Sequence, residues 1–557
     1  MSFSERKYIE CINHNSLSNE LKKQLENMSD IEKESAFSKH ISFGTGGLRS
    51  KMGPGTNRLN EITVKKCAEG YARWLIDNYD IKTGIKIIIA YDNRKNSKMF
   101  SEVMIAILAK YNIYTHVFKD MRPTPELSYA IRKYNAQGGI VITASHNTAE
   151  YNGIKMYDEK GCQCVDKITK EIKKYIDLVN DELNITFANK KTIEAFSSII
   201  KDDCDISYIN ECKKVIVNED VDFSKLIVLY TPQHGTGLYP VTSALRQLGC
   251  QLILVDSQSF PDENFVNTKC PNPEKIESFE KALEITKEKD IDIIIGTDPD
   301  CDRIGVMVKH EHSYKLLSGN QIGLIMLNYI IKNKHLKSNS IVYNTVVSSS
   351  LAIKMCQREG IKIESTLTGF KNIGEKINNL KEPNDFLFAL EESNGYLINN
   401  IVRDKDGLQA AILISEIATW CKNRSKTLID YLSDIYKEYG MFEDNQDSIE
   451  IKCDNGQEIV ASIMNKMRNL TDTFLNTKIY KIEDYMTSII IKDKRKQKLD
   501  YPKSNLIKIY FSKYSWIAVR PSGTEPKIKI YYCIEKSDSL DMQTIRDGVY
   551  NLLINNN

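Results

Sequence analysis

Short apolar runs alternate with longer amphipathic stretches along most of the chain. The runs at residues 85–90, 226–229 and 341–343 are rich in β-branched residues, and a polar turn follows each of them. Apolar runs of this length are typical of strands buried on both faces of a sheet. Because helical stretches separate them, the pattern predicts α/β domains with mixed, largely parallel sheets.

The order of these elements recurs three times. Each repeat opens with a buried strand and closes with a second one, at residues 139–142, 291–295 and 386–390, which leads into a polar loop. After about residue 440, polar helices and alternating strands replace this pattern. We therefore expect three consecutive similar α/β domains and a smaller C-terminal α+β domain, with bounds 1–204, 205–318, 319–440 and 441–557.

Composition narrows the class of protein. The 557 residues are 41% hydrophobic and 27% charged, and the net charge of +2 gives no chain-wide attraction to nucleic acid. We interpret the basic run at 492–498 as a solvated loop. The 13 cysteines form no CxxC pair, and neither a secretory leader nor a membrane span is evident. The expectation is a cytoplasmic protein with free thiols and with no nucleic-acid or membrane partner.

A serine loop follows the buried strand at 139–142. Ser145 lies among small residues, and His146 is its neighbour. Open α/β sheets place their chemistry where a buried strand ends in a polar loop. An ordinary surface turn uses the same residue types and is an equally good interpretation of this loop alone.

An acidic loop follows the strand at 291–295. Asp298, Asp300 and Asp302 alternate, so their carboxylates can converge on one cation. Oxygen-only ligands favour a hard ion such as Mg²⁺. An EF-hand is excluded because Arg303 and His310 stand where its glycine and its glutamate are required. A solvated acidic turn is the alternative.

Three further loops suit an anionic, hydroxylated ligand. Residues 520–527, RPSGTEPK, offer a guanidinium, hydroxyls and backbone donors for a phosphate. Residues 391–395, EESNG, suit sugar hydroxyls, and the glycine-rich turn at 43–49 lets the backbone approach a ligand closely. Each loop alone could be a polar turn. Together with a serine and a metal loop, they predict phosphoryl transfer.

Four of these loops, TASHN, DPDCDR, EESNG and RPSGTEPK, resemble in order the signature loops of the α-D-phosphohexomutase superfamily, which includes phosphoglucomutases and phosphomannomutases. The resemblance covers nearly the whole chain and implies four domains around one central cleft. EESNGYL and LTGFK look more like the branch of phosphopentomutases and glucose-1,6-bisphosphate synthases. Thr148, Pro299 and Cys301 depart from residues that are common in the family.

The resemblance also implies roles for individual residues. Ser145 would carry the phosphoryl group, His146 and Lys155 would assist proton transfer, and Arg49 would face a phosphate. The phosphate on Ser145 would complete a Mg²⁺ site with Asp298, Asp300 and Asp302. The implied substrate-binding residues are Thr45, Arg303, Thr368, Glu391, Ser393, Lys405, Arg520, Ser522, Gly523 and Thr524.

The implied reaction interconverts glucose 1-phosphate and glucose 6-phosphate, with a phosphoserine enzyme and glucose 1,6-bisphosphate as intermediate and activator. Ribose or deoxyribose 1-phosphate remains open as the main substrate. A catalytically silent scaffold of the same fold is the alternative from another class. A Ser/His hydrolase would need a GxSxG elbow, which the serine loop lacks. We expect a monomer or a weak homodimer.

Overall fold

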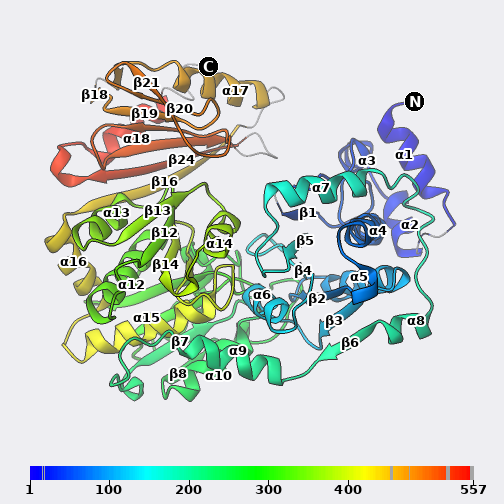
Figure 1. The fold of residues 1–557 in the computed structure, drawn as a ribbon, viewed down its shortest axis with the longest axis horizontal. Helices are drawn as coiled ribbons and strands as arrows, with labels where there is room; N and C mark the ends of the chain where they lie inside the picture. Colours follow the sequence, from blue (N-terminus) through cyan, green and yellow to red (C-terminus); the bar gives the residue numbers. More distant parts are fainter. Residues whose placement is uncertain are drawn as a thin grey trace. The chain divides into compact units, whose positions relative to one another are not determined.

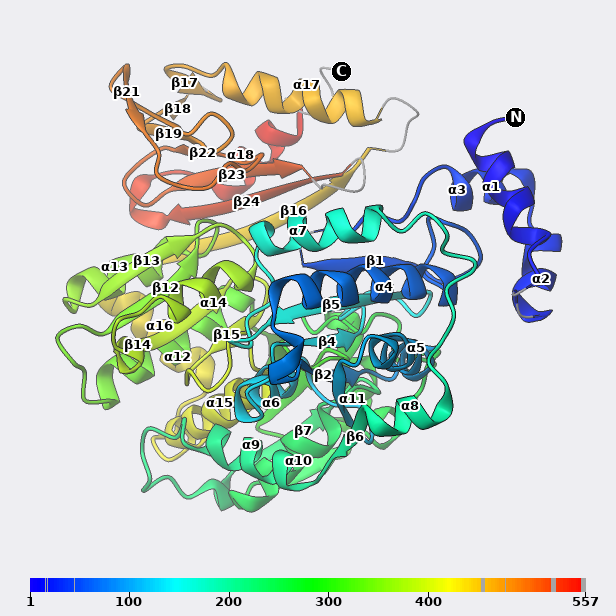
Figure 2. The same cartoon turned by 45° about the vertical axis from the view of Figure 1, so that its right-hand side comes forward.

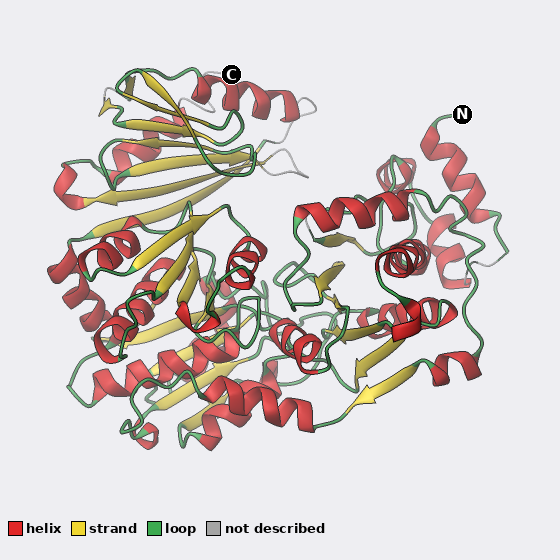
Figure 3. Cartoon of the chain, viewed as in Figure 1, coloured by secondary structure: helices red, strands yellow, loops and turns green. Residues whose placement is uncertain are grey.

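The chain forms two compact units in a computed structural model, which describes residues 1–15, 17, 19–44, 46–451, 456–475, 477–521 and 527–551. Unit 1 comprises residues 1–317, 370–386 and 394–425, and unit 2 comprises residues 318–369, 387–393 and 426–557. Both contain helices and strands (Figures 1 and 3), which confirms the α/β class. Among the described helices, none has the length and apolarity that crossing a bilayer requires.

The first sheet of unit 1 has six strands in the order β1-β5-β4-β2-β3-β6. The pairs β4–β2, β2–β3 and β3–β6 are parallel, whereas β5 pairs antiparallel with both β4 and β1. The sheet is thus mixed, as predicted. Its strands are β1 (Gly47–Lys51), β2 (Lys86–Tyr91), β3 (Tyr114–Phe118), β4 (Gly138–Ile142), β5 (Tyr151–Asp158) and β6 (Ser197–Ile200).

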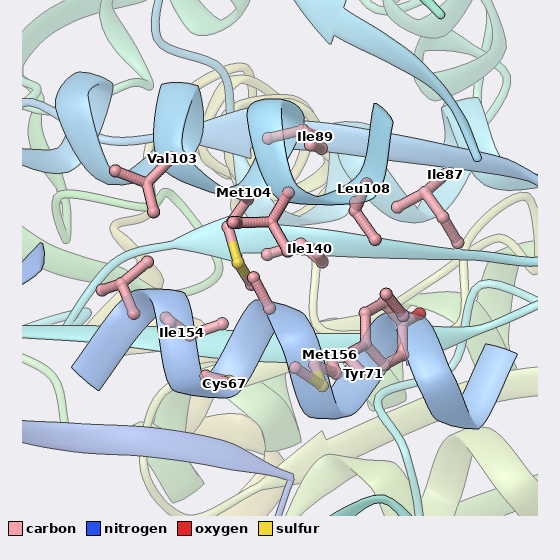
Figure 4. Packing of buried hydrophobic residues seen from close by; sticks show 14 of the residues in the cluster. Cys67, Tyr71, Ile87, Ile89, Val103, Met104, Leu108, Ile140, Ile154 and Met156 are labelled. Atoms are coloured by element: carbon pink, nitrogen blue, oxygen red, sulfur yellow. The ribbon is translucent and has the colours of Figure 1, made fainter. Parts of the chain in front are cut away.

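Helices cover both faces of this sheet because every central strand is apolar on both sides. Ile87, Ile89 and Ile140 pack in one core cluster with α4 and α5 (Figure 4), whereas Ile88 and Val141 pack in another with α6. The alternation follows the two-residue period of a strand. Helices α4 and α7 contact each other beside β1 and β5 (Figure 2). The helices are α4 (Glu61–Asn78), α5 (Ser97–Lys110), α6 (Thr124–Lys133), α7 (Asp166–Asp177) and α8 (Lys190–Ala195).

The second sheet of unit 1 has the order β11-β10-β9-β7-β8. Strands β9, β7 and β8 are parallel, and β10 returns antiparallel beside β9 with Ile304 opposite Thr297. Helix α15 contacts α9 and α10. Further helices and strands of unit 1, which include the five strands of this sheet, are α9 (Asp203–Lys213), β7 (Ile227–Thr231), α10 (Leu238–Gln247), β8 (Gln251–Leu254), α11 (Glu280–Ile285), β9 (Ile293–Thr297), β10 (Ile304–His310), β11 (Ser313–Leu316), α14 (Phe370–Asn378), β15 (Gly395–Leu397) and α15 (Gly407–Lys422).

Three short helices open the chain: α1 (Phe3–Ile12), α2 (Asn19–Glu26) and α3 (Asp30–Phe37). Capping boxes start α1 and α3: Ser29 accepts from the backbone of Glu32, and the Glu32 carboxylate accepts from the backbone of Ser29. Buried Leu25 and Phe37 belong to a small core cluster of their own.

Unit 2 contains a parallel pair of strands, β12 and β13, with β14 on the other side of β12. Residues 387–391 of β14 belong to this unit. The elements are α12 (Gly319–Asn333), β12 (Ile341–Thr345), α13 (Ser350–Arg358), β13 (Lys362–Thr366), β14 (Phe386–Glu391) and α16 (Leu428–Tyr439).

The C-terminal part of unit 2 is a seven-stranded sheet in the order β16-β24-β23-β22-β19-β20-β21, and all its pairs are antiparallel. The predicted solvated loop at 492–498 is wrong in part: the residues are exposed, but they belong to the hairpin of β20 and β21, because turn residues Asp493 and Lys494 reverse the chain. The elements are β16 (Phe442–Glu450), α17 (Gly456–Arg468), β17 (Thr473–Phe474), β18 (Thr477–Lys478), β19 (Lys481–Asp484), β20 (Ile489–Lys492), β21 (Arg495–Lys498), β22 (Ile507–Tyr510), β23 (Trp516–Pro521), β24 (Lys527–Glu535) and α18 (Met542–Tyr550).

Removing a side chain from the centre of the first sheet tests the packing in Figure 4. Ile140 on β4 is fully buried. We expect Ile140→Ala to lower the free energy of unfolding by about 2–5 kcal/mol, because a cavity replaces packed methylene groups. Urea denaturation followed by circular dichroism measures this loss. Ile199→Ala on β6, where the side chain is 59% exposed, is the control and should change stability by less than about 0.5 kcal/mol.

Candidate active site

Ser145 lies in the hairpin that joins β4 to β5, directly after the buried end of β4. The residue is 2% exposed, and its backbone has φ 53°, in the left-handed region. Its N–H donates to Thr143 Oγ1 at 2.8 Å. A non-glycine residue in this conformation costs on the order of 1–3 kcal/mol, and such strain is concentrated at functional sites.

A buried arginine that the sequence analysis missed fixes the serine loop. The guanidinium of Arg94 donates to the carbonyl oxygens of Ser145, Asn147, Thr148 and Tyr151, at 2.6, 2.5, 2.8 and 3.0 Å. Asp92 compensates its charge at 3.2 Å. The loop is thus fixed through its backbone, including the carbonyl of Thr148. A polar YDNR turn at the end of β2 was the available signal.

The three alternating aspartates converge, as the sequence predicts. One carboxylate oxygen from each of Asp298, Asp300 and Asp302 lies within 4.8 Å of the others, and the three residues are at most 1% exposed. The tight turn between β9 and β10 produces this convergence, with Cys301 at φ 53°. Cys301 thus has a left-handed backbone conformation, which glycine adopts more readily than other residues. Ser145 Oγ donates to Asp298 Oδ2 at 2.8 Å, so the two loops meet.

Cations surround the aspartate cluster. Lys155 Nζ, on β5 beside the serine loop, lies 2.6 Å from Asp300 Oδ2 and 3.2 Å from Asp302 Oδ2. Lys405 Nζ lies 3.1 Å from Asp302 Oδ2. Lys405 and Lys155 therefore share one carboxylate oxygen.

The ionisation of the three aspartates differs. Burial raises the pKa of Asp298 well above its usual range, and the neighbouring carboxylates of Asp302 and Asp300 raise it further. Burial also opposes the charged form of Asp302, but Lys405, Lys155 and Arg303 outweigh burial and lower its pKa. Asp300 has a lowered pKa because Lys155 outweighs burial and the charge of Asp302. Negative charge is thus disfavoured at Asp298, whereas the cations stabilise it on Asp300 and Asp302.

The donor set fits a hard divalent cation. Asp300 Oδ1 and Asp302 Oδ1 are buried and have no hydrogen-bond partner. Their other oxygens are occupied by Lys155, Lys405 and Thr124. Carboxylate oxygens without nitrogen or sulfur suit Mg²⁺ rather than zinc.

Three predicted residues contact the site from its edge. His146 Nδ1 lies 3.3 Å from Ser145 Oγ. Arg49 donates from Nη1 to Asn147 Oδ1 at 3.1 Å. Arg303 forms an ion pair with Glu274 at 2.6 Å, and its backbone N–H donates to Asp298 Oδ1 at 3.0 Å.

Other predicted substrate-binding residues lie in unit 2. Arg520 donates to Thr368 Oγ1 at 2.5 Å, and Glu391 Oε1 accepts from the backbone of Gly369 at 2.9 Å. Ser393 follows β14 in the same unit. The structure thus brings the loop at 391–395 and Arg520 together around residues 368–369. Thr45, Ser522, Gly523 and Thr524 lie outside the described residues.

Thr124 escaped sequence reasoning, whereas Asp404 belongs to the turn at 404–407 that the resemblance links to substrate contacts. Thr124, the first residue of α6, donates to Asp300 Oδ2 at 2.8 Å. Asp404 accepts from Tyr157 Oη at 2.7 Å and lies 3.3 Å from Lys405 Nζ. The RPTPE turn at 122–126 offered no acidic or nucleophilic pattern to single it out.

Comparisons with known proteins match this chain to one family. The models for α/β/α domains I, II and III of phosphoglucomutase/phosphomannomutase match residues 40–182, 206–311 and 318–439. The phosphoglucomutase of Staphylococcus aureus strain MRSA252 is 37% identical over 93% of this chain and 94% of its own length. That of Staphylococcus haemolyticus is 34% identical over the same shares.

Solved structures share the fold. A putative phosphomannomutase from Thermus thermophilus superposes with a TM-score of 0.68 at 19% identity, covering 92% of this chain and 98% of its own. The phosphoglucomutase parafusin from Paramecium superposes with a TM-score of 0.67 at 19% identity, over 92% and 94%. The chain belongs to the phosphoglucomutase/phosphomannomutase family.

Proposed function

We propose that the protein interconverts glucose 1-phosphate and glucose 6-phosphate through a phosphoserine at Ser145. The observation that carries this proposal is the buried contact between Ser145 Oγ and Asp298 Oδ2 at 2.8 Å, within the three-aspartate cluster. The Staphylococcus relatives named phosphoglucomutase, which match over nearly the whole chain, support it. The intact serine and aspartates argue against a silent scaffold.

We propose that Ser145 Oγ first donates and then accepts the phosphoryl group. In the first half-reaction the bond between Ser145 Oγ and phosphorus breaks, and a bond from the sugar's O6 to phosphorus forms, giving glucose 1,6-bisphosphate. In the second, the phosphoryl group at O1 returns to Oγ, leaving glucose 6-phosphate. In each step the attacking hydroxyl loses a proton and the leaving oxygen gains one; we assign His146 to accept the first proton and the Lys155 ammonium, held by Asp300 and Asp302, to donate the second.

We propose that Asp298, Asp300 and Asp302 hold Mg²⁺. Bound there, the ion neutralises charge on the transferring phosphoryl group. The buried Oδ1 atoms of Asp300 and Asp302, which accept no hydrogen bond, support this assignment. A structural neighbour, N-acetylphosphoglucosamine mutase from Aspergillus fumigatus, was solved with GlcNAc-6P and magnesium; its TM-score is 0.53 at 12% identity. Lys155 and Lys405 orient the carboxylates and balance their charge.

We further propose that Thr368, Glu391, Ser393 and the loop beginning at Arg520 bind the sugar and the phosphate that is not being transferred, with Thr45, Arg303, Ser522, Gly523 and Thr524. The division into four domains at residues 204, 318 and 440, the monomeric or weakly dimeric state and the cytoplasmic location remain predictions. Ribose 1-phosphate is the rival substrate; kcat/KM for both sugars, each measured with its bisphosphate activator, separates them.

Replacing the nucleophile tests the covalent step. We expect Ser145→Ala to lower kcat by several orders of magnitude, because the oxygen that carries the phosphoryl group is lost. The variant should also fail to take up label from glucose 1,6-bisphosphate, which mass spectrometry of the intact protein detects. Ser243→Ala on α10 is the control and should retain both properties. Near-normal turnover by the Ser145→Ala protein would sink the mechanism.

Removing a carboxylate tests the metal assignment. Excess EDTA should abolish turnover, and Mg²⁺ should restore it better than Ca²⁺, because the smaller ion suits a compact octahedral site. Asp302→Asn should raise the Mg²⁺ concentration needed for half-maximal activity at least tenfold. Exposed Asp220→Asn is the matched control. Full activity in EDTA would contradict the assignment.

A charge-conserving change tests the phosphate-binding role of Arg520. Arg520→Lys keeps the cation but loses the planar fork that makes two parallel hydrogen bonds to a phosphate. We expect KM for glucose 1-phosphate to rise about tenfold, with lower kcat and slower phosphorylation by bisphosphate. Steady-state kinetics with both compounds measures this. Lys513→Arg, in the loop before β23, is the control; wild-type KM values in Arg520→Lys would leave the loop as an ordinary turn.

A further inference from the structure

Three consecutive carbonyl oxygens of the aspartate loop accept hydrogen bonds from three separate parts of unit 1. Thr236 N donates to Pro299 O at 2.8 Å, Thr124 N to Asp300 O at 2.9 Å, and Gly407 N to Cys301 O at 3.1 Å. These donors precede or begin α10, α6 and α15. The backbone of the loop is therefore fixed independently of its side chains.

Of these three donors, Thr124 also contacts an aspartate side chain. Its Oγ1 donates to Asp300 Oδ2 at 2.8 Å, the oxygen that Lys155 Nζ approaches to 2.6 Å. Thr124 is fully buried. Because Oδ2 is occupied twice, the buried Oδ1 of Asp300, which has no hydrogen-bond partner, is the oxygen left for a ligand.

The local sequence makes Thr124 a rigid donor. Pro123 is the N-cap residue of α6 and Pro125 follows at the second helical position, so the backbone on both sides has a fixed φ. The β-branched side chain of threonine also has few rotamers in a helix. Lys155 contributes charge from a long, flexible side chain, whereas the rigid Thr124 hydroxyl donates to Asp300 Oδ2 from a fixed direction.

We propose that Thr124 is a positioning residue for the cation site: its hydroxyl fixes the Asp300 carboxylate so that Oδ1 is presented to the metal. The inference rests on the proposed function in one respect, the identity of the metal. Hydrogen-bond partners of metal ligands orient them, and losing one typically costs 10–100-fold in affinity. Any substitution of Thr124 except proline keeps the backbone hydrogen bond from its N–H to Asp300 O. The effect of the hydroxyl can therefore be measured separately from that of the backbone.

The test compares Thr124→Val, which removes the hydroxyl and keeps the shape, with Thr124→Ser, which keeps the hydroxyl. Isothermal titration calorimetry gives the Kd of Mn²⁺ for the full chain without sugar phosphate. Thr169→Val is the matched control, since buried Thr169 on α7 donates to the carbonyl of Cys164 at 3.2 Å, away from the aspartates. Asp302→Asn shows whether the titration reports this site.

We expect Thr124→Val to weaken Mn²⁺ binding about tenfold or more, with Thr124→Ser and Thr169→Val within about twofold of the unaltered chain. If Thr124→Val does not fold, as judged by circular dichroism, Thr124→Ala takes its place with the same expected loss. An unchanged Kd in the folded variant overturns the proposal, as does the absence of saturable Mn²⁺ binding to the unaltered chain. Binding that Asp302→Asn abolishes, in a protein that converts no hexose phosphate, refutes the proposed function and leaves the role of Thr124 intact.

Discussion

Mutual repulsion among Asp298, Asp300 and Asp302 is the constraint on which the rest of the site depends. Their oxygens lie within 4.8 Å of one another in the protein interior. At an effective dielectric constant near 20, each pair of charges at this separation costs about 3 kcal/mol. Three ionised carboxylates would cost about as much as the whole stability of a typical domain, and burial together with this repulsion raises the pKa of Asp298. The fold therefore needs compensating charge here, and Lys155, Lys405 and Arg303 supply it from within unit 1.

This compensation also prepares the cluster for a ligand. Each aspartate has at least one oxygen occupied by a fixed donor, whether Ser145, Thr124 or a lysine. The proposed Mg²⁺ and phosphoserine would bring opposite and nearly equal charge, so the charge balance among the side chains would be preserved when both are present.

The sequence predicted the parts of the fold that depend on local pattern. The buried strands at 139–142 and 291–295 were visible because a hydrophobic pattern is local. The strand at 495–498 was missed because it is exposed and basic, and pairing with β20, not apolarity, defines it. The two-unit grouping depends on contacts between distant segments, to which a local pattern is blind.

The same distinction separates the predicted site residues from those that were missed. Ser145 and the three aspartates carry reactive groups in recognisable loops, so their chemistry can be inferred from residue type. Arg94, buried on carbonyl oxygens, and Thr124, between two prolines, act on other residues through geometry. Their side chains resemble ordinary turn residues until the chain is folded. The strained φ of Ser145 is sustained by this second group, because four of the surrounding carbonyls are bonded to Arg94. Residues with reactive groups can therefore be identified from the sequence. The residues that hold them in position can be identified only from the tertiary structure.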